Sequence, residues 1–129
     1  MARGKDKHME RLASVNALGT PLSKRSKSKC EFCDDRSSLR VYEVPPVPEE
    51  PAYEAAILLC DACSELLNIK KYEERERPLH FLVEKAWSEI RPVQLASVRI
   101  LYKLADLKVA WAQNAVADLY LDPEIEADL

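Results

Sequence analysis

Two Cys-x-x-Cys pairs constrain this chain more than any other feature of its sequence. The pairs are Cys30–Cys33 and Cys60–Cys63, they contain all four cysteines, and 26 residues separate them. Two such pairs are typical of a site in which four thiolates hold one zinc ion. We therefore expect each pair to form a tight turn, and the residues between them to form a β-rich excursion that returns the second pair to the first. The predicted cofactor is one structural Zn²⁺ bound by Cys30, Cys33, Cys60 and Cys63.

Structural disulfides, a redox dithiol and a rubredoxin-like iron site are the alternatives that this spacing leaves open. The N-terminus is polar and charged, and the longest apolar run, 55–60, is far shorter than the roughly 20 residues that cross a bilayer. The sequence therefore predicts a cytoplasmic protein with no membrane partner, in which thiols stay reduced. This favours a metal over disulfides. Iron fits the spacing, but Asp34 and Ser64 stand where rubredoxin pairs usually have glycine.

Positive charge is concentrated at the N-terminus. Residues 1–29 carry a net charge of +6, whereas residues 30–129 carry −9. A basic arm on an acidic body can bind nucleic acid, dock on an acidic protein, or fold back onto its own body. Few aromatic residues interleave the arm, so base stacking is not indicated. The expected contact residues for a nucleic acid or protein partner are Lys24, Arg25, Lys27 and Lys29.

The apolar periodicity predicts a small α+β fold. We expect a four-cysteine zinc ribbon or treble-clef-like module followed by a small helical bundle, with a short N-terminal helix. Gly19 and Pro21 are expected to end that first helix. Four aromatic residues are expected in the core and rim of the bundle rather than in a ligand cage: Trp87, Tyr102, Trp111 and Tyr120. The predicted helices are 6–18, 62–69, 79–90, 92–107, 109–119 and 124–129, the strands are 39–44 and 57–59, and 70–77 is a linker.

These elements predict three regions along the chain. Residues 1–22 form an N-terminal helical arm, residues 23–70 form the four-cysteine zinc-binding module, and residues 71–129 form a helical region. Glycine occurs only at positions 4 and 19, so glycine-rich phosphate loops and dinucleotide fingerprints are absent.

Several segments resemble the zinc-ribbon region of bacterial PhnA-like proteins. They are Cys30-Glu31-Phe32-Cys33, Leu39-x-Val41-Tyr42-Glu43-Val44-Pro45-Pro46, Ile57-Leu58-Leu59-Cys60-x-x-Cys63, Ala86-Trp87-Ser88-Glu89, Pro92-Val93-Gln94 and Tyr120-Leu121-Asp122. The resemblance covers roughly residues 25–125 and does not include the small C-terminal β-barrel of many members. It implies a metal-binding protein. The family name also implies an alternative role, as an accessory factor or enzyme in phosphonate metabolism.

The residues weigh against an enzyme. Catalytic zinc keeps an open coordination position, usually with three protein ligands, whereas four cysteines close the shell. The segment is also similar to the scaffold of HNH nucleases, but residues 30–63 contain no histidine and no asparagine. The two histidines, His8 and His80, are distant from the cysteines in the sequence. The predicted function is therefore a non-catalytic, structural zinc site that supports a binding module, with a protein–protein adaptor as a further option.

Overall fold

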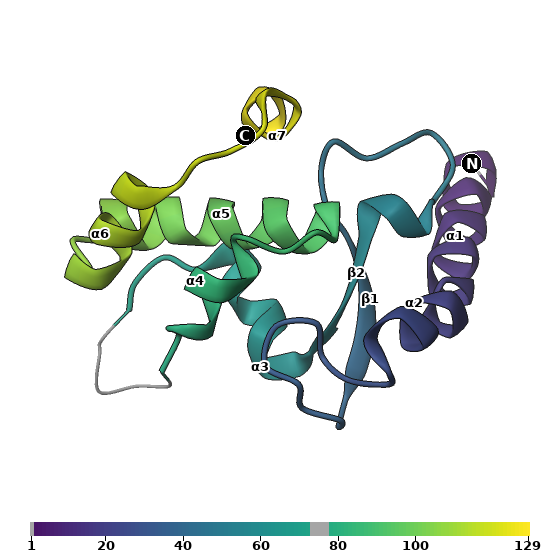
Figure 1. Cartoon of the computed structure of the whole chain (residues 1–129). Helices are drawn as coiled ribbons and strands as arrows, with labels where there is room; N and C mark the ends of the chain where they lie inside the picture. Colours follow the sequence, from purple (N-terminus) through teal and green to yellow (C-terminus); the bar gives the residue numbers. More distant parts are fainter. Residues whose placement is uncertain (1, 73–77) are drawn as a thin grey trace.

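The protein is a mixed structure in which helices surround a two-stranded antiparallel sheet (Figure 1). The computed structural model describes residues 2–72 and 78–129. Strands β1 (Leu39–Glu43) and β2 (Ala56–Cys60) pair so that Leu39 lies opposite Cys60. The helices are α1 (Ala2–Ala17), α2 (Gly19–Ser26), α3 (Asp61–Ser64), α4 (Phe81–Lys85), α5 (Arg91–Asp106), α6 (Ala110–Asp118) and α7 (Pro123–Asp128), with 3-10 turns η1 (Tyr53–Ala55) and η2 (Glu65–Asn68).

Strand β2 is buried along its whole length because both of its faces are covered. Ala56 and Leu58 pack with Leu22 of α2 in a small cluster on one face. Ile57 and Leu59 belong to the main core on the opposite face. A strand covered on both faces needs apolar residues at every position rather than at alternate ones. The hairpin therefore separates the N-terminal helices from the helices that follow it (Figure 1).

The N-terminal helix ends within one residue of its predicted end, and a second helix follows it directly. α1 ends at Ala17, and α2 begins at Gly19 after a single intervening residue. The first helix therefore ends before Gly19 as predicted, but Gly19 and Pro21 also open a new helix, which was not predicted. Proline lacks a backbone N–H, which the first turn of a helix does not need, so Pro21 is accommodated in the first turn of α2. These residues redirect the chain toward the hairpin.

The segment after the second cysteine pair is helical, but in two short pieces. α3 covers one turn from Asp61 to Ser64, and η2 continues to Asn68 as a tighter 3-10 turn. The predicted continuous helix over 62–69 is thus replaced by an α turn and a 3-10 turn. Residues 70–72 have no regular structure, and the rest of the predicted linker, 73–77, lies outside the described residues.

Helix α5 is the centre of the helical region and contacts α4, α6 and α7. It begins at Arg91 with Pro92 in its first turn, as predicted, and the helices predicted over 109–119 and 124–129 are also present. The helix predicted over 79–90 is reduced to α4. Trp87 follows α4 and is 51% exposed, so the prediction that it belongs to the buried stripe is wrong.

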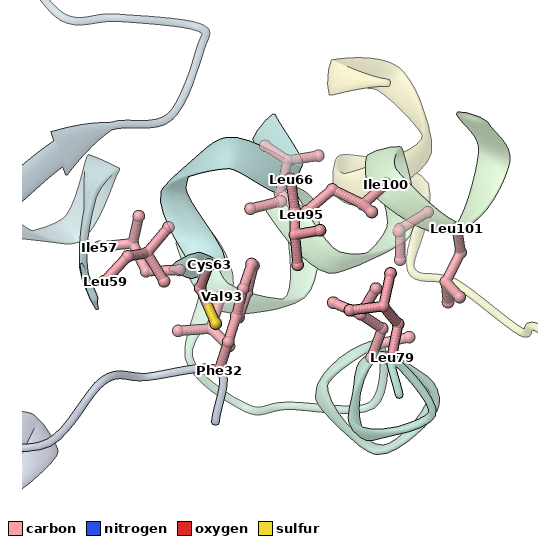
Figure 2. Close-up of a cluster of buried hydrophobic side chains, with 14 of the residues drawn as sticks. Phe32, Ile57, Leu59, Cys63, Leu66, Leu79, Val93, Leu95, Ile100 and Leu101 are labelled. Carbon is pink, nitrogen blue, oxygen red and sulfur yellow. The ribbon is translucent and has the colours of Figure 1, made fainter. Parts of the chain in front are cut away.

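One apolar core joins the cysteine-bearing part to the helical region. Figure 2 shows Phe32 and Cys63 among side chains from α5 and from the segment before α4. Because these side chains are buried together, neither region closes its apolar surface alone. The three predicted domain boundaries stay a prediction. The labelled core residues are Phe32, Ile57, Leu59, Cys63, Leu66, Leu79, Val93, Leu95, Ile100 and Leu101 (Figure 2).

Candidate metal centre

The structure brings all four cysteines together. The four sulfur atoms lie within 4.8 Å of one another, and the Sγ atoms of Cys33 and Cys60 are 3.6 Å apart. Zinc–thiolate bonds of about 2.3 Å in tetrahedral geometry place neighbouring sulfurs about 3.8 Å apart. None of the four cysteines forms a disulfide, so every sulfur can serve as a ligand. The cluster therefore has the donor set and the spacing of a four-thiolate metal site, and its residues can hold a metal ion.

The first cysteine pair lies in a tight turn that follows α2. The N–H of Cys30 donates to the carbonyl of Asp35 at 2.7 Å, and the N–H of Asp34 donates to the carbonyl of Cys30 at 3.0 Å. Asp34 has a φ of 66°, in the left-handed region that glycine usually fills after such a pair. Aspartate tolerates this region better than most residues. Asp34 therefore adopts the left-handed conformation at a position that is usually occupied by glycine.

The second cysteine pair lies where a strand becomes a helix. Cys60 is the last residue of β2 and caps the N-terminus of α3 in an extended conformation. Cys63 is in α3 and is fully buried. Because β1 and β2 are antiparallel, β2 brings the second cysteine pair back to the first. The residues between the pairs thus form the β-rich excursion that the spacing predicts.

The pKa values of the first pair differ in direction. Hydrogen bonding from the Cys63 side chain, assisted by backbone groups, lowers the pKa of Cys30 from 9.0 to about 4 although burial opposes the shift. Burial raises the pKa of the Cys33 thiol. The contacts of Cys30 therefore favour its thiolate, which is the form that binds a metal. Of the four ligands only Cys33 is partly exposed.

A largely buried ion pair braces the cysteine cluster, and the sequence analysis did not predict it. The carboxylate of Glu31, which lies between Cys30 and Cys33, is bound by the guanidinium of Arg25 through Nε at 2.7 Å and Nη2 at 2.9 Å. The same carboxylate accepts a hydrogen bond from the N–H of Leu58 at 2.8 Å. The N–H of Glu31 donates to the carbonyl of Leu58, also at 2.8 Å. Glu31 therefore fastens the first cysteine turn to β2.

Arg25 uses its remaining donors on the same part of the chain. Nη1 donates to the carbonyl of Tyr53 at 3.0 Å, and Nη2 donates to the carbonyl of Ala56 at 2.8 Å. The guanidinium also lies 5.4 Å from the centre of the Tyr53 ring. Nothing in the hydropathy or spacing of the sequence marks Arg25 and Glu31 as partners, because ion pairs leave no periodic signal.

The four basic residues predicted as partner contacts thus divide into two kinds. The side chain of Arg25 is committed to internal contacts, whereas Lys24 and Lys27 are exposed on and after α2 and Lys29 is half-buried beside Cys30. Arg11 behaves like Arg25, because it forms a fork on the carboxylate of Glu43. It also donates to the carbonyls of Pro48 and Glu49. The interpretation that the arm folds back onto the body is confirmed for Arg11 and Arg25.

His80 does not join the cysteine cluster. The ring of His80 stacks on Trp111 with 4.3 Å between ring centres, and His8 lies in α1. The only group of metal-ligating side chains found within residues 2–72 and 78–129 is the cysteine cluster. In the described part of the chain, no helix is both long and apolar enough to cross a membrane.

Comparison with known proteins gives no relative. No family model, no curated protein and no solved structure matches this chain.

Two segments that are far apart in the sequence meet in a hollow of about 490 Å³, away from the cysteines. Trp87, Ser88 and Glu89 line one side, and Tyr120 and Asp122 line the other. Trp87 is 51% exposed and Tyr120 is 85% exposed, so the prediction that they belong to the core and rim is wrong for both. Trp111 packs against the core as predicted, and Tyr102 is 36% exposed at the surface of α5. The two segments that line the hollow are the C-terminal segments on which the PhnA-like resemblance rests.

Proposed function

We propose that this protein is a non-catalytic zinc-binding protein, in which one structural zinc ion supports a binding module for nucleic acid or for a protein partner. The observation that carries the proposal is the convergence of four cysteine sulfurs within 4.8 Å. Four thiolates complete a tetrahedral shell, which leaves no position for a water molecule or a substrate. The metal then acts by holding the fold.

The connections of the site support this role. Through the chain, the sulfurs tie together the turn after α2, the end of β2 and the start of α3, and Glu31 and Arg25 add a polar brace to α2. The second cysteine pair opens a helix instead of continuing as strand, which supports a treble-clef-like module over a zinc ribbon. A metal at this point fixes how α2 is presented at the surface.

We extend the proposal to a relationship with the PhnA-like family. Its support is the set of shared segments in the sequence, together with the meeting of Trp87–Glu89 with Tyr120–Asp122 in one hollow. The proposal does not extend to phosphonate chemistry, since neither the closed sulfur shell nor the stacking of His80 on Trp111 offers a reacting group.

Metal analysis of single-site variants tests the structural site. Protein purified after zinc-supplemented expression and exhaustive dialysis is expected to retain one zinc per chain. Cys33→Ser and Cys60→Ser are expected to retain less than a stoichiometric amount and to lose cooperative unfolding. Ser64→Ala is the matched control, because Ser64 is adjacent to Cys63 but contributes only a hydroxyl bound to the Asp61 carbonyl. Full zinc retention by the Cys33→Ser and Cys60→Ser variants contradicts the proposal.

A further inference from the structure

Helix α2 lies on the side of the hairpin opposite to α5 (Figure 1). Two hollows of about 440 and 400 Å³ lie along it and share Gly19 and Ser23, so they are neighbours on one surface. We call this surface the α2 strip. Its polar side chains are Asn16, Thr20, Ser23, Lys24, Lys27, Ser28, Arg40 and Tyr42.

The chemistry of the α2 strip is uniform. All of its polar side chains can donate a hydrogen bond, and no carboxylate is among the described residues that line the two hollows. Lysine, arginine, serine, threonine, asparagine and tyrosine are the side chains that proteins direct at phosphate oxygens. Six of the eight polar residues belong to residues 1–29, whose net charge is +6, whereas the whole chain has a net charge of −3, so the strip carries part of the positive charge of this molecule. We propose that the α2 strip binds the phosphodiester backbone of nucleic acid.

Three cations of the strip are available to phosphate. Lys24 and Lys27 are exposed. The side chain of Arg40 is 73% exposed, and its contact with Asp61 is a long 3.6 Å ion pair between two exposed groups. Such a pair contributes little and is easily exchanged for another anion. Arg25, by contrast, is bound internally and is not a member of the strip.

Nucleic acid fits the strip better than an acidic protein does. Protein interfaces draw most of their energy from buried aromatic and other large anchors that fill pockets. The apolar side chains that line the strip, Leu39, Val41 and Leu58, are at least half-buried and form its floor, and Tyr42 is half-buried as well. With no exposed aromatic ring among its described residues for a base to stack on, the strip is expected to bind backbone without reading sequence.

The inference rests on the proposed binding function and predicts a particular salt dependence. Three phosphate contacts give a slope of log K against log[salt] of about −2.7 on duplex DNA, which is about a 40-fold loss of affinity between 50 and 200 mM salt. Lys24→Gln and Lys27→Gln are each expected to reduce the slope by about 0.9. Lys108→Gln, which removes the same charge at the far end of α5, is the matched control and is expected to leave the slope unchanged.

The experiment is a fluorescence anisotropy titration of the full-length, zinc-loaded protein with a short mixed-sequence duplex DNA and with single-stranded RNA. Lys24→Gln, Lys27→Gln and Arg40→Gln together are expected to abolish most of the salt-dependent binding. Thermal unfolding of each variant controls for folding, because Lys24 also lies near the C-terminus of α2. If the combined variant does not fold, the two exposed single lysine variants still measure the slope.

The outcomes separate this inference from the proposed function. If the folded triple variant binds DNA as tightly as the wild type does, the α2 strip is not the binding surface, and nucleic acid binds elsewhere on the protein. Absence of binding by the wild type at 50 mM salt overturns nucleic acid as the partner altogether. Displacement of the DNA by polyglutamate at equal charge concentration also overturns the assignment, because it identifies an unselective polyanion surface that fits an acidic protein equally well.

Discussion

The cysteine module, residues 30–63, and the helical half, residues 79–129, are held together by different means. The cysteine module has one short hairpin and depends on four sulfurs and the Arg25–Glu31 pair for its geometry. The helical half is built around α5, nine of whose sixteen residues are buried. A helix with this much buried surface is stabilised by apolar packing. We therefore expect the cysteine module, which has little core of its own, to rely on the proposed metal and on polar bracing.

The cysteine module and the helical half are not independent domains. Phe32 and Cys63 are buried in the same cluster as Leu79 and Leu101 (Figure 2). A change in one region therefore also affects the other through this shared core. The region that is affected first depends on the change. Metal loss acts first on the cysteine module, and a cavity acts first on α5. Variants in each region test this difference, in order of decreasing expected effect.

Loss of the metal is expected to have the largest effect. Structural zinc contributes on the order of 10 kcal/mol to small modules. Cys63→Ser is expected to remove hydrogen-exchange protection from β1 and β2, while α5 retains partial protection. Amide exchange measured by mass spectrometry checks this result. Uniform loss of protection over both regions would show that they form a single cooperative unit.

Breaking the ion pair is expected to have the next largest effect. Glu31→Ala leaves the guanidinium of Arg25 without its carboxylate and the N–H of Leu58 without its acceptor, at a cost of about 3–5 kcal/mol. Replacing both residues by methionine removes the unpaired charge, so the double variant is expected to recover part of the loss. Urea unfolding of the single and double variants measures both values. A double variant no more stable than Glu31→Ala would show that the buried charge is not the main cost.

A cavity beside α5 is expected to reduce the free energy of unfolding by a similar or smaller amount than loss of the ion pair. Leu101 is fully buried, and Leu101→Ala is expected to cost about 2–5 kcal/mol while zinc remains bound. Leu12→Ala is the control, since Leu12 is 48% exposed on α1 and its loss is expected to cost less than about 0.5 kcal/mol. Denaturant unfolding and metal content are measured on the same samples. Release of zinc by Leu101→Ala would remove the distinction between the two regions.

The smallest effect is expected at the first cysteine turn. Asp34 has a φ of 66°, which glycine adopts freely and which a β-branched residue adopts only with strain. Asp34→Gly is expected to be neutral or to stabilise by up to about 1 kcal/mol, and Asp34→Val to destabilise by about 1–2 kcal/mol. Thermal unfolding of the zinc-loaded variants gives the difference. The same melting temperature for both variants would show that the turn is not constrained by its backbone.

Features with a local pattern were predictable from the sequence. The cysteine cluster, both strands of the hairpin and helix α5 follow from Cys-x-x-Cys spacing, a short apolar run and a helical stripe that begins at Pro92. The end of α1 was predictable from Gly19 and Pro21, but the start of α2 at Gly19 was not, because glycine and proline mark both the end of a helix and the first turn of the next one. The predicted helix over 79–90 was longer than α4 for a related reason. The apolar periodicity that includes Trp87 does not show where the surface that covers the helix ends.

The partners of the charged residues were also not predictable. Lys24 and Arg25 are adjacent in the sequence, yet one is exposed and the other is buried against Glu31. Only the folded hairpin decides which of them faces the body. The same limit applies to the α2 strip, because Asn16 at the end of α1 and Arg40 of β1 meet on one surface only after β1 has packed against α1.

The central claim is that four sulfurs hold one zinc ion and that the fold of the cysteine module depends on it. Native mass spectrometry of the intact protein, paired with thermal unfolding before and after treatment with a strong chelator, tests this most directly. The account predicts a mass increase of one zinc per chain and a lower melting temperature after chelation. A bound iron instead of zinc would correct the metal. A metal-free protein that unfolds cooperatively at the same temperature with and without chelator would contradict the account.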